Sequence, residues 1–271
     1  MTPSPQLQSL AGHLKSAADG LLLIVTGAGV SLASGIPTFR GSDPDAIWAR
    51  DVTELGTFRY FQQDPVGSWR WYLHRFEKVQ GARPNAAHVA CAALEQWQTG
   101  RGGDFLLVTQ NIDTLHRQAG TERLVEVHGR SDRARCSRDG CELGSPRGSI
   151  ARSRLDLAHF AANPSPETLP RCPKCHSPLR QHVLWFDEYY SSHEDYQFDR
   201  VITASSLCEV MVFIGTSFSV GVTELLLRSG LVRSIPMFSV DPSGAVPTQR
   251  MTPIPEPAET ALPTLVSLLQ N

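Results

Sequence analysis

Four cysteines form two short-spaced pairs in a stretch that shows little apolar periodicity. Cys136 and Cys141 are separated by four residues and Cys172 and Cys175 by two, with thirty residues between the pairs. Two such pairs on turns can place four thiolates tetrahedrally around one Zn²⁺. Four thiolates leave no open coordination position, so we expect a structural rather than a catalytic zinc. The alternative is four unligated thiols in a reducing compartment.

A glycine-rich turn follows the first strongly apolar run of the chain. The segment from Gly27 to Gly35 reads GAGVSLASG and comes directly after the run LLLIV at 21–25. Glycines there permit a tight turn and close approach of the backbone to a pyrophosphate, and the start of a following helix supplies N–H donors. A glycine turn between a strand and a helix also occurs for purely structural reasons. This loop alone leaves both interpretations open.

Further segments extend the pattern in a fixed order along the chain. The set is GAGVSLASGIPTFRG at 27–41, TQNIDTLH at 109–116, VHG at 127–129 and GTS at 215–217. Together these segments resemble the signature of the sirtuin family, over roughly residues 20–265 of the chain. The resemblance implies an NAD-dependent enzyme that removes acyl groups from lysine side chains of proteins or peptides. Its products would be the free lysine, nicotinamide and O-acyl-ADP-ribose.

His128 is the candidate general base. It follows the predicted strand Leu124–Val127 and precedes Gly129, so it should emerge at the carboxyl edge of a parallel sheet. Open α/β folds bind their ligands at that edge, and a histidine there can take up a proton near neutral pH. Any single histidine of the nine in the chain is more often structural than catalytic. The resemblance identifies His128 as the base that accepts a proton from a ribose hydroxyl.

The resemblance also implies roles around the nicotinamide and the two riboses. Asn111 and Asp113 would line the nicotinamide and ribose pocket and take part in catalysis, while Thr216 and its neighbour would face the adenosine ribose. Phe39, with Arg40 beside it, would exclude the water that otherwise hydrolyses the sugar cation. The complete predicted NAD site is Gly27, Ala28, Gly29, Ser31, Pro37, Thr38, Phe39, Arg40, Gln110, Asn111, Ile112, Asp113, Gly215, Thr216, Ser217 and Asp241.

Tyr72 and Arg75 are candidates for contacting the acyl group. They share one face of a helix if residues 68–79 are helical, and an arginine fork beside a phenol suits a carboxylate. Their segment YLHR, with Pro84-Asn85 twelve residues beyond Tyr72, resembles the Tyr-x-x-Arg signature of the desuccinylase branch of sirtuins. The resemblance implies binding of succinyl, malonyl or glutaryl lysine, besides or instead of acetyl lysine. The alternative is an amphipathic helix whose Tyr and Arg face solvent.

Some segments depart from the family pattern. Asp187, within VLWFDE at 183–188, stands where many sirtuins have the glycine of a Phe-Gly-Glu strand that pairs with the substrate backbone. The change adds a negative charge and removes backbone freedom. Asp241-Pro242 and Ser219–Val222 also differ from the usual sequences near the adenosine and after the GTS segment. We therefore expect NAD binding to be retained, and either an altered pairing with the peptide or a substrate that is not an ordinary peptide.

Two other functions use the same predicted site. Water or another nucleophile could intercept the activated ribose, which gives NAD hydrolysis or protein ADP-ribosylation. A non-catalytic NAD sensor is the third hypothesis, and the presence of His128, Asn111 and Asp113 argues against it because a pure binder needs no base.

The elements that must position these residues alternate between strands and helices. Strand-like apolar runs lie at 21–25, 105–109, 124–127, 209–214 and 235–240, and helical stretches at 6–19, 85–98 and 221–233. This order predicts an α/β fold with a Rossmann-like, doubly wound parallel sheet. The proline-rich stretch 242–258 is expected to be a loop.

Two insertions interrupt the alternation and are expected to form a smaller lobe. Residues 40–83 are predicted to be a mostly helical insertion and residues 131–182 a zinc-binding module. The NAD-binding domain then consists of 1–39, 84–130 and 183–271.

The composition of the chain argues against some classes of binding partner. The chain of 271 residues is 41% hydrophobic and 19% charged, with a formal net charge of −2, so no charged tail indicates binding to nucleic acid or membranes. The N-terminus lacks the pattern of a signal peptide, and we expect a cytoplasmic protein. The oligomeric state stays open.

Overall fold

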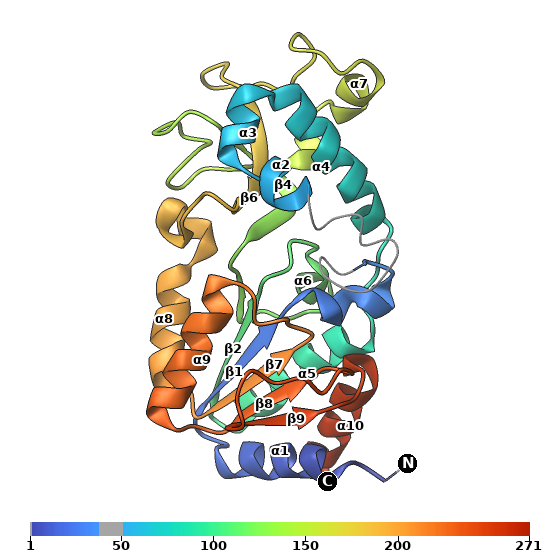
Figure 1. The fold of residues 1–271 in the computed structure, drawn as a ribbon, viewed down its shortest axis with the longest axis vertical. Helices are drawn as coiled ribbons and strands as arrows, with labels where there is room; N and C mark the ends of the chain where they lie inside the picture. The colour runs from blue at the N-terminus through green and yellow to red at the C-terminus, as the bar shows by residue number, and fades with distance from the viewer. Residues whose placement is uncertain (1, 38–50) are drawn as a thin grey trace.

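The larger lobe is built on a six-stranded sheet in which every strand pair is parallel. The computed structural model describes residues 2–37 and 51–271. The strands are β1 Leu21–Thr26, β2 Asp104–Thr109, β3 Leu124–Glu126, β7 Val210–Ile214, β8 Met237–Val240 and β9 Met251–Ile254. Their order across the sheet is β3-β2-β1-β7-β8-β9 (Figure 1). The order reverses beside β1, and such a switch point places ligands at the carboxyl ends of β1 and β7.

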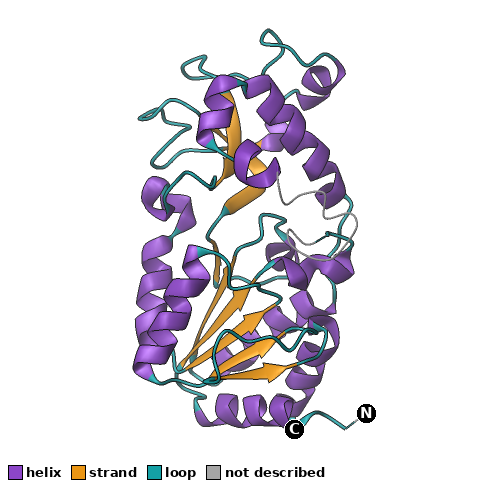
Figure 2. Ribbon diagram, viewed as in Figure 1, coloured by secondary structure: helices purple, strands orange, loops and turns teal. Residues whose placement is uncertain are grey.

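Alternating side chains of the strands bury both faces of this sheet. Leu22 and Ile24 of β1 point into one apolar cluster, and Leu23 and Val25 point into the other. The first face is covered by α1 Pro5–Ser16, α5 Ala86–Gly100 and α10 Ala258–Gln270. The second face is covered by α8 Phe198–Leu207 and α9 Gly221–Arg233 (Figure 2). Because both faces are covered, the strands are continuous apolar runs, and for that reason they could be recognised in the sequence.

The smaller lobe contains a three-stranded antiparallel sheet and most of the remaining helices. Its strands, in the order β5-β4-β6, are β4 Gly129–Cys136, β5 Ile150–Ala151 and β6 Leu179–Val183. Helices α2 Asp51–Leu55, α3 Phe58–Gln63, α4 Pro65–Gln80 and α7 Leu157–Ala162 belong to the same lobe (Figure 1). Aromatic side chains from α3 and α4 share one apolar cluster with Cys136, Cys172 and β6. The two insertions therefore pack against each other.

Short helices occupy the connections. They are η1 Ala28–Ser34 after β1, α6 Leu115–Gln118 after β2, η2 Arg152–Arg154, η3 Tyr190–Ser192 and η4 Glu194–Tyr196. No described helix is long and apolar enough to cross a membrane.

The predicted α/β fold with a parallel sheet and a second lobe is confirmed, and helix 221–233 has the predicted bounds. The expectation of a loop over 242–258 is wrong for its second half, because Met251–Ile254 forms β9. Pro253 fits there since β9 is the outermost strand of the sheet, where a residue without an N–H is tolerated. The division into domains at residues 40–83 and 131–182 stays a prediction.

Candidate functional site

The four predicted zinc ligands lie together in the smaller lobe. Their sulfur atoms all fall within 4.8 Å of one another, with Cys136 Sγ 3.4 Å from Cys175 Sγ and Cys141 Sγ 3.6 Å from Cys172 Sγ. A tetrahedral zinc with Zn–S bonds of about 2.3 Å requires sulfur separations of about 3.8 Å. The donor set therefore fits Zn²⁺. Its position between the end of β4 and the turn before β6 ties the two long strands of the small sheet together.

Two glycine loops cross at the switch point of the large sheet. Gly29 N–H donates to the carbonyl oxygen of Gly215 at 2.9 Å. A Cβ atom on Gly29 would lie 2.7 Å from Gly215 Cα, and one on Gly27 would lie 2.7 Å from the Gly215 oxygen. These contacts leave no room for side chains, which explains the glycines after β1 and β7. Glycine backbone at such an edge is the kind that a phosphate group can approach closely.

A buried network links Ser31, Asn111 and Asp113 behind this crossing. Ser31 Oγ donates to Asp113 Oδ2 at 2.6 Å, and Asn111 Nδ2 lies 3.1 Å from both Ser31 Oγ and the Gly27 oxygen. The other oxygen of Asp113 accepts from Leu115 N–H at 2.9 Å. The loop after β2 is thereby fixed to the glycine turn after β1. Three residues predicted from two separate motifs thus lie together.

Two further histidines, His88 and His116, are buried beneath the carboxyl edge of the large sheet. His116 Nε2 lies 3.0 Å from Thr26 Oγ1, which in turn lies 2.9 Å from Thr109 Oγ1. The His88 ring packs against that of His116 with centroids 4.7 Å apart and a tilt of 56°. Burial lowers the pKa of both histidines, that of His116 well below its ordinary value. Both rings are neutral and take part in packing and hydrogen bonding.

His128 presents one defined nitrogen at the edge. Its Nδ1 lies 2.9 Å from the Gln110 carbonyl oxygen, which can only accept, so Nδ1 carries the proton. The Nε2 atom is then the basic one, and it lies 3.3 Å from Tyr190 Oη. Burial lowers the pKa of His128 to about 4, and the hydrogen bond to Gln110 opposes this only in part. The ring is therefore neutral near pH 7 and able to take up a proton.

The remaining predicted NAD residues lie along the same edge or outside the described residues. Gln110 Nε2 donates to the Thr26 oxygen at 3.1 Å and to Thr216 Oγ1 at 3.2 Å. Ser217 is exposed after β7, and Asp241 closes its own turn after β8 by accepting from Ser243 N–H at 2.9 Å. Ala28 lies in η1, Pro37 is half-buried beyond it and Ile112 packs toward the smaller lobe. Thr38, Phe39 and Arg40 lie outside the described residues.

Tyr72 and Arg75 are buried on α4, so the alternative in which they face solvent is wrong. They are 7% and 9% exposed. The Tyr72 ring packs 6.3 Å from that of Trp185, and Arg75 Cζ lies 3.9 Å from the centroid of the Trp71 ring. Burial raises the pKa of Tyr72, so its hydroxyl stays protonated and can donate a hydrogen bond.

Asp187 caps a helix instead of standing in a strand. Strand β6 ends at Val183, and the Asp187 carboxylate accepts from Phe58 N–H at 2.7 Å and Arg59 N–H at 3.1 Å, at the start of α3. Phe186 N–H donates to the Gly56 oxygen at 3.0 Å. The N-terminal end of α3 thus compensates the extra negative charge. Residues 186–187 are held against the helical insertion.

The adjoining Glu188 was not predicted and is the best-bonded carboxylate of the smaller lobe's described residues. It accepts from Arg180 Nη1 at 2.5 Å, Arg135 Nη2 at 2.9 Å and Trp185 N–H at 2.9 Å. Burial opposes its ionisation, but the hydrogen bonds and charges of the two arginines lower the pKa of Glu188. No sequence pattern indicates this role, because one of its partners, Arg135, is 53 residues away.

A second cluster of His182, His193 and Asp195 lies apart from the zinc ligands. Their ligand atoms lie within 4.8 Å of one another. His193, however, already uses both ring nitrogens: Nε2 lies 3.1 Å from the Gly148 oxygen, and Nδ1 accepts from Asp195 N–H at 3.1 Å. Asp195 also lies 3.1 Å from His182 Nε2. The partners of His193 and the Asp195–His182 contact therefore lie within the cluster and its neighbours, while His182 Nδ1 has no hydrogen-bond partner among the described residues.

Comparison with known proteins agrees with this geometry. The model of the Sir2 family matches residues 27–222. The chain is 33% identical over 215 residues to the NAD-dependent deacetylase sir2E of Dictyostelium discoideum, covering 75% of this chain and 60% of that protein's length. It is also 33% identical over 256 residues to the mitochondrial NAD-dependent protein deacylase sirtuin-5 of Danio rerio, covering 92% of this chain and 82% of the relative.

A solved complex of a Sir2 homolog with NAD has the same fold. Its TM-score is 0.77 at 32% identity, over 100% of this chain and 96% of the other. The family model covers well over half of the chain, including the glycine loop, the polar network and His128. The chain belongs to the Sir2 family.

Proposed function

We propose that the protein is an NAD-dependent protein-lysine deacylase that transfers the acyl group to ADP-ribose. The observation that carries the proposal is the orientation of His128. Its Nδ1 is committed to Gln110, and its neutral Nε2 lies at the carboxyl edge next to the crossing glycine loops. NAD is the second substrate and supplies the ribose that receives the acyl group.

The chain's own residues then have separate tasks. Nε2 of His128 takes the proton from a ribose hydroxyl, so that this oxygen can attack the acyl carbon. Asn111 and Asp113, held by Ser31, shape the pocket for the nicotinamide and its ribose. The glycine backbone after β1 accommodates the phosphates. The zinc module takes no part in the chemistry and maintains the smaller lobe.

The decisive experiment is product analysis with an acyl-lysine peptide and NAD. We expect nicotinamide, free lysine and O-acyl-ADP-ribose in equal amounts. His128→Ala should reduce turnover by about 10²–10⁴-fold, the usual contribution of a general base, without changing zinc content or melting temperature. Nicotinamide release without O-acyl-ADP-ribose would instead assign NAD hydrolysis or ADP-ribosyl transfer. Full activity of His128→Ala would refute the assigned base.

The pH dependence follows from the low pKa of His128. The base works only when it is neutral, and its pKa of about 4 keeps it neutral through the physiological range. We expect kcat/KM for NAD to be level down to roughly pH 5.5 and to fall as the pH approaches the pKa, since this ratio reports ionisation in the free enzyme. A fall centred near pH 6.5 would indicate an unperturbed histidine.

We also propose that Tyr72 and Arg75 bind an acidic acyl group. A protonated phenol and a guanidinium, both in an apolar lobe, suit the distal carboxylate of succinyl, malonyl or glutaryl lysine. The combined variant Tyr72→Phe, Arg75→Met should lose activity on the acidic acyl peptides much more than on the acetyl peptide. Equal losses on all acyl groups would assign the pair to packing.

Acyl-lysine proteins or peptides are the proposed partners, and a cytoplasmic location stays a prediction. Cell fractionation of the tagged full chain would test the location.

A further inference from the structure

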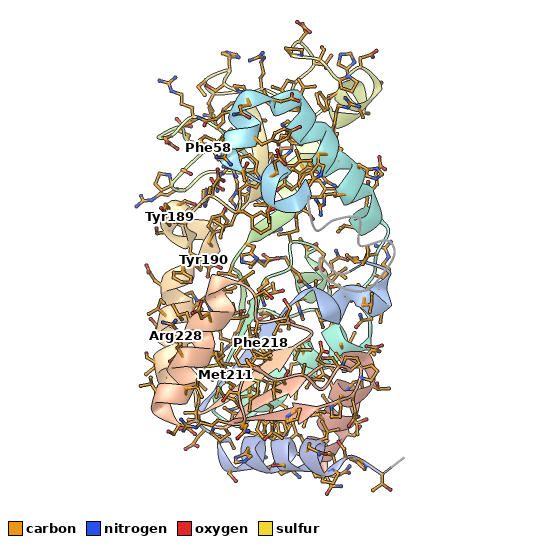
Figure 3. The ribbon with its side chains drawn as sticks, viewed as in Figure 1. Phe58, Tyr189, Tyr190, Met211, Phe218 and Arg228 are labelled. Atoms are coloured by element: carbon orange, nitrogen blue, oxygen red, sulfur yellow. The ribbon has the colours of Figure 1, made fainter. Side chains whose placement is uncertain are left out.

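Tyr190 joins three parts of the molecule at the candidate base. It begins η3, directly after the segment that Asp187 and Glu188 anchor. Its Oη lies 3.3 Å from His128 Nε2 and 3.3 Å from the backbone nitrogen of Val222, in the first turn of α9. Figure 3 places Tyr190 at the level where the two lobes meet. None of the sequence motifs included this residue.

The direction of each hydrogen bond follows from the donors available. Val222 N–H can only donate, so the phenol oxygen accepts from it. Since Nδ1 of His128 already donates to Gln110, Nε2 can only accept, and the phenol O–H must donate to it. A single chain of donors therefore runs from Val222 through Tyr190 and His128 to the Gln110 carbonyl.

The surroundings fix the phenol in this place. The Tyr190 ring stacks on Phe198 with centroids 4.5 Å apart and an interplanar angle of 10°. Helix α9 has no side-chain cap at Val220, so Tyr190 supplies one of the acceptors that its N-terminal end requires. The partial positive charge of that helix end makes the phenol a stronger donor toward His128.

We propose that Tyr190 is a positioning residue for the base: its hydroxyl ties His128 Nε2 to the N-terminal end of α9 in the ligand-free protein. This inference rests on the proposed function, in which Nε2 receives the proton of a ribose hydroxyl. In the catalytic complex the ribose hydroxyl takes the phenol's place as hydrogen-bond partner. Tyr190 thus keeps the base oriented until the second substrate arrives.

The charged groups near His128 pair with one another, and the Tyr190 phenol is the side chain that contacts His128 Nε2. Glu126, two residues before it, pairs with Arg117 at 2.6 Å and with Arg130 at 3.7 Å, and Arg130 also binds Asp132. No charge contributes to the shifted pKa of His128, which burial dominates. A hydrogen bond donated to Nε2 stabilises the neutral ring, so its loss should raise the pKa of His128.

The test is Tyr190→Phe, which keeps the ring and removes only the hydroxyl. Imidazole ¹⁵N spectra of the ligand-free protein should show the Nε2 resonance displaced and the pKa of His128 raised by about 0.5–1 unit, the equivalent of one ordinary hydrogen bond. The acidic limb of kcat/KM for NAD should move to higher pH by the same amount. Tyr189→Phe is the matched control, because the Tyr189 side chain is 79% exposed.

The outcomes separate this inference from the proposed function. An unchanged Nε2 resonance and an unchanged pKa in Tyr190→Phe would overturn the positioning role, whatever the activity. Absence of NAD-dependent turnover in the unmodified protein would refute the deacylase instead, while the spectra would still test Tyr190. Equal shifts in Tyr189→Phe and Tyr190→Phe would also overturn the proposal, since the exposed phenol has no contact with the base.

Discussion

The larger lobe buries its sheet between two layers of apolar side chains, whereas the smaller lobe combines one apolar cluster with a few specific bonds. In the larger lobe, successive residues of β1 fill the two opposite clusters. In the smaller lobe, β5 has only two residues, and a buried carboxylate with two buried arginines lies beside the four thiolates. Apolar area is lost gradually on substitution, while a ligand or an ion partner is lost all at once. The residues predicted to bind NAD therefore lie mostly on the larger lobe, and Tyr72 and Arg75, predicted to bind the acyl group, lie on the smaller one.

Removal of zinc should give the largest difference in stability between the two lobes. Cys172→Ser, or chelation, should take zinc from one ion per chain to none and abolish deacylation, because metal binding supplies folding free energy to such modules. Hydrogen exchange should show amides of β4 and β6 losing protection while those of β1 and β7 keep theirs. Cys91→Ala, a buried thiol of the larger lobe, is the control and should keep the zinc. Equal loss of protection in both sheets would show that the lobes unfold as one unit.

Glu188→Gln should be the next largest effect. Breaking a buried ion pair leaves Arg180 and Arg135 without their counter-charge and costs about 3–5 kcal/mol of unfolding free energy. Urea unfolding measures this loss. The control is Glu224→Gln, whose exposed pair with Arg228 at 2.6 Å should contribute less than about 1 kcal/mol. Equal losses of unfolding free energy in the two variants would show that the ion pairs of Glu188 stabilise the protein no more than an exposed pair does.

Gly29→Ala should test how tightly the glycine loops of the larger lobe are packed. Its Cβ would meet Gly215 at 2.7 Å, and we expect a loss of about 2–3 kcal/mol from overpacking together with weaker NAD binding. Gly12→Ala, on an exposed face of α1 with no atom within 4 Å, should instead stabilise by about 0.5–1 kcal/mol. Thermal melting and NAD titration distinguish the two. If Gly29→Ala bound NAD with unchanged affinity, the loop after β1 would not be part of the NAD site.

Asp187→Ala should have the smallest effect on the free energy of unfolding. It should also change KM for the acyl peptide. Loss of the cap on α3 should cost about 1 kcal/mol. Asp64→Ala, which removes a similar cap from α4, should cost the same. Of these two variants, only Asp187→Ala should change KM for the acyl peptide, because Asp187 belongs to the segment before Tyr190 and Asp64 caps α4. A change of KM in both variants would attribute it to general loosening of the helical insertion.

The sequence predicted the elements that obey local rules. The strands of the large sheet are apolar runs with turns at both ends, and helix 221–233 was found with its bounds. The four cysteines could be grouped because their spacing alone restricts the geometry. The second half of 242–258 was assigned wrongly because proline is rare in strands, and only the edge position of β9 makes it acceptable there.

Contacts between segments that are distant in the chain could not be predicted from the sequence. The role of Asp187 depends on the N–H groups of residues 58–59, about 130 positions earlier in the chain. Tyr190 lies 62 positions from His128 and 32 from Val222, and no periodicity connects such separations. The departure at Asp187 was noticed as a change of charge, but its partner could be recognised only once α3 had been placed.

One of the connections between the lobes passes through the base itself. His128 lies between the end of β3 in the large sheet and Gly129 at the start of β4, and its carbonyl oxygen accepts from Leu184 N–H on the returning chain at 2.9 Å. His128 is thus positioned like the pin of a hinge. If the lobes rotate against each other, groups far from this point sweep through long arcs while the imidazole barely moves. Such a rotation would change the distances between groups on opposite lobes and leave the proton acceptor in one place.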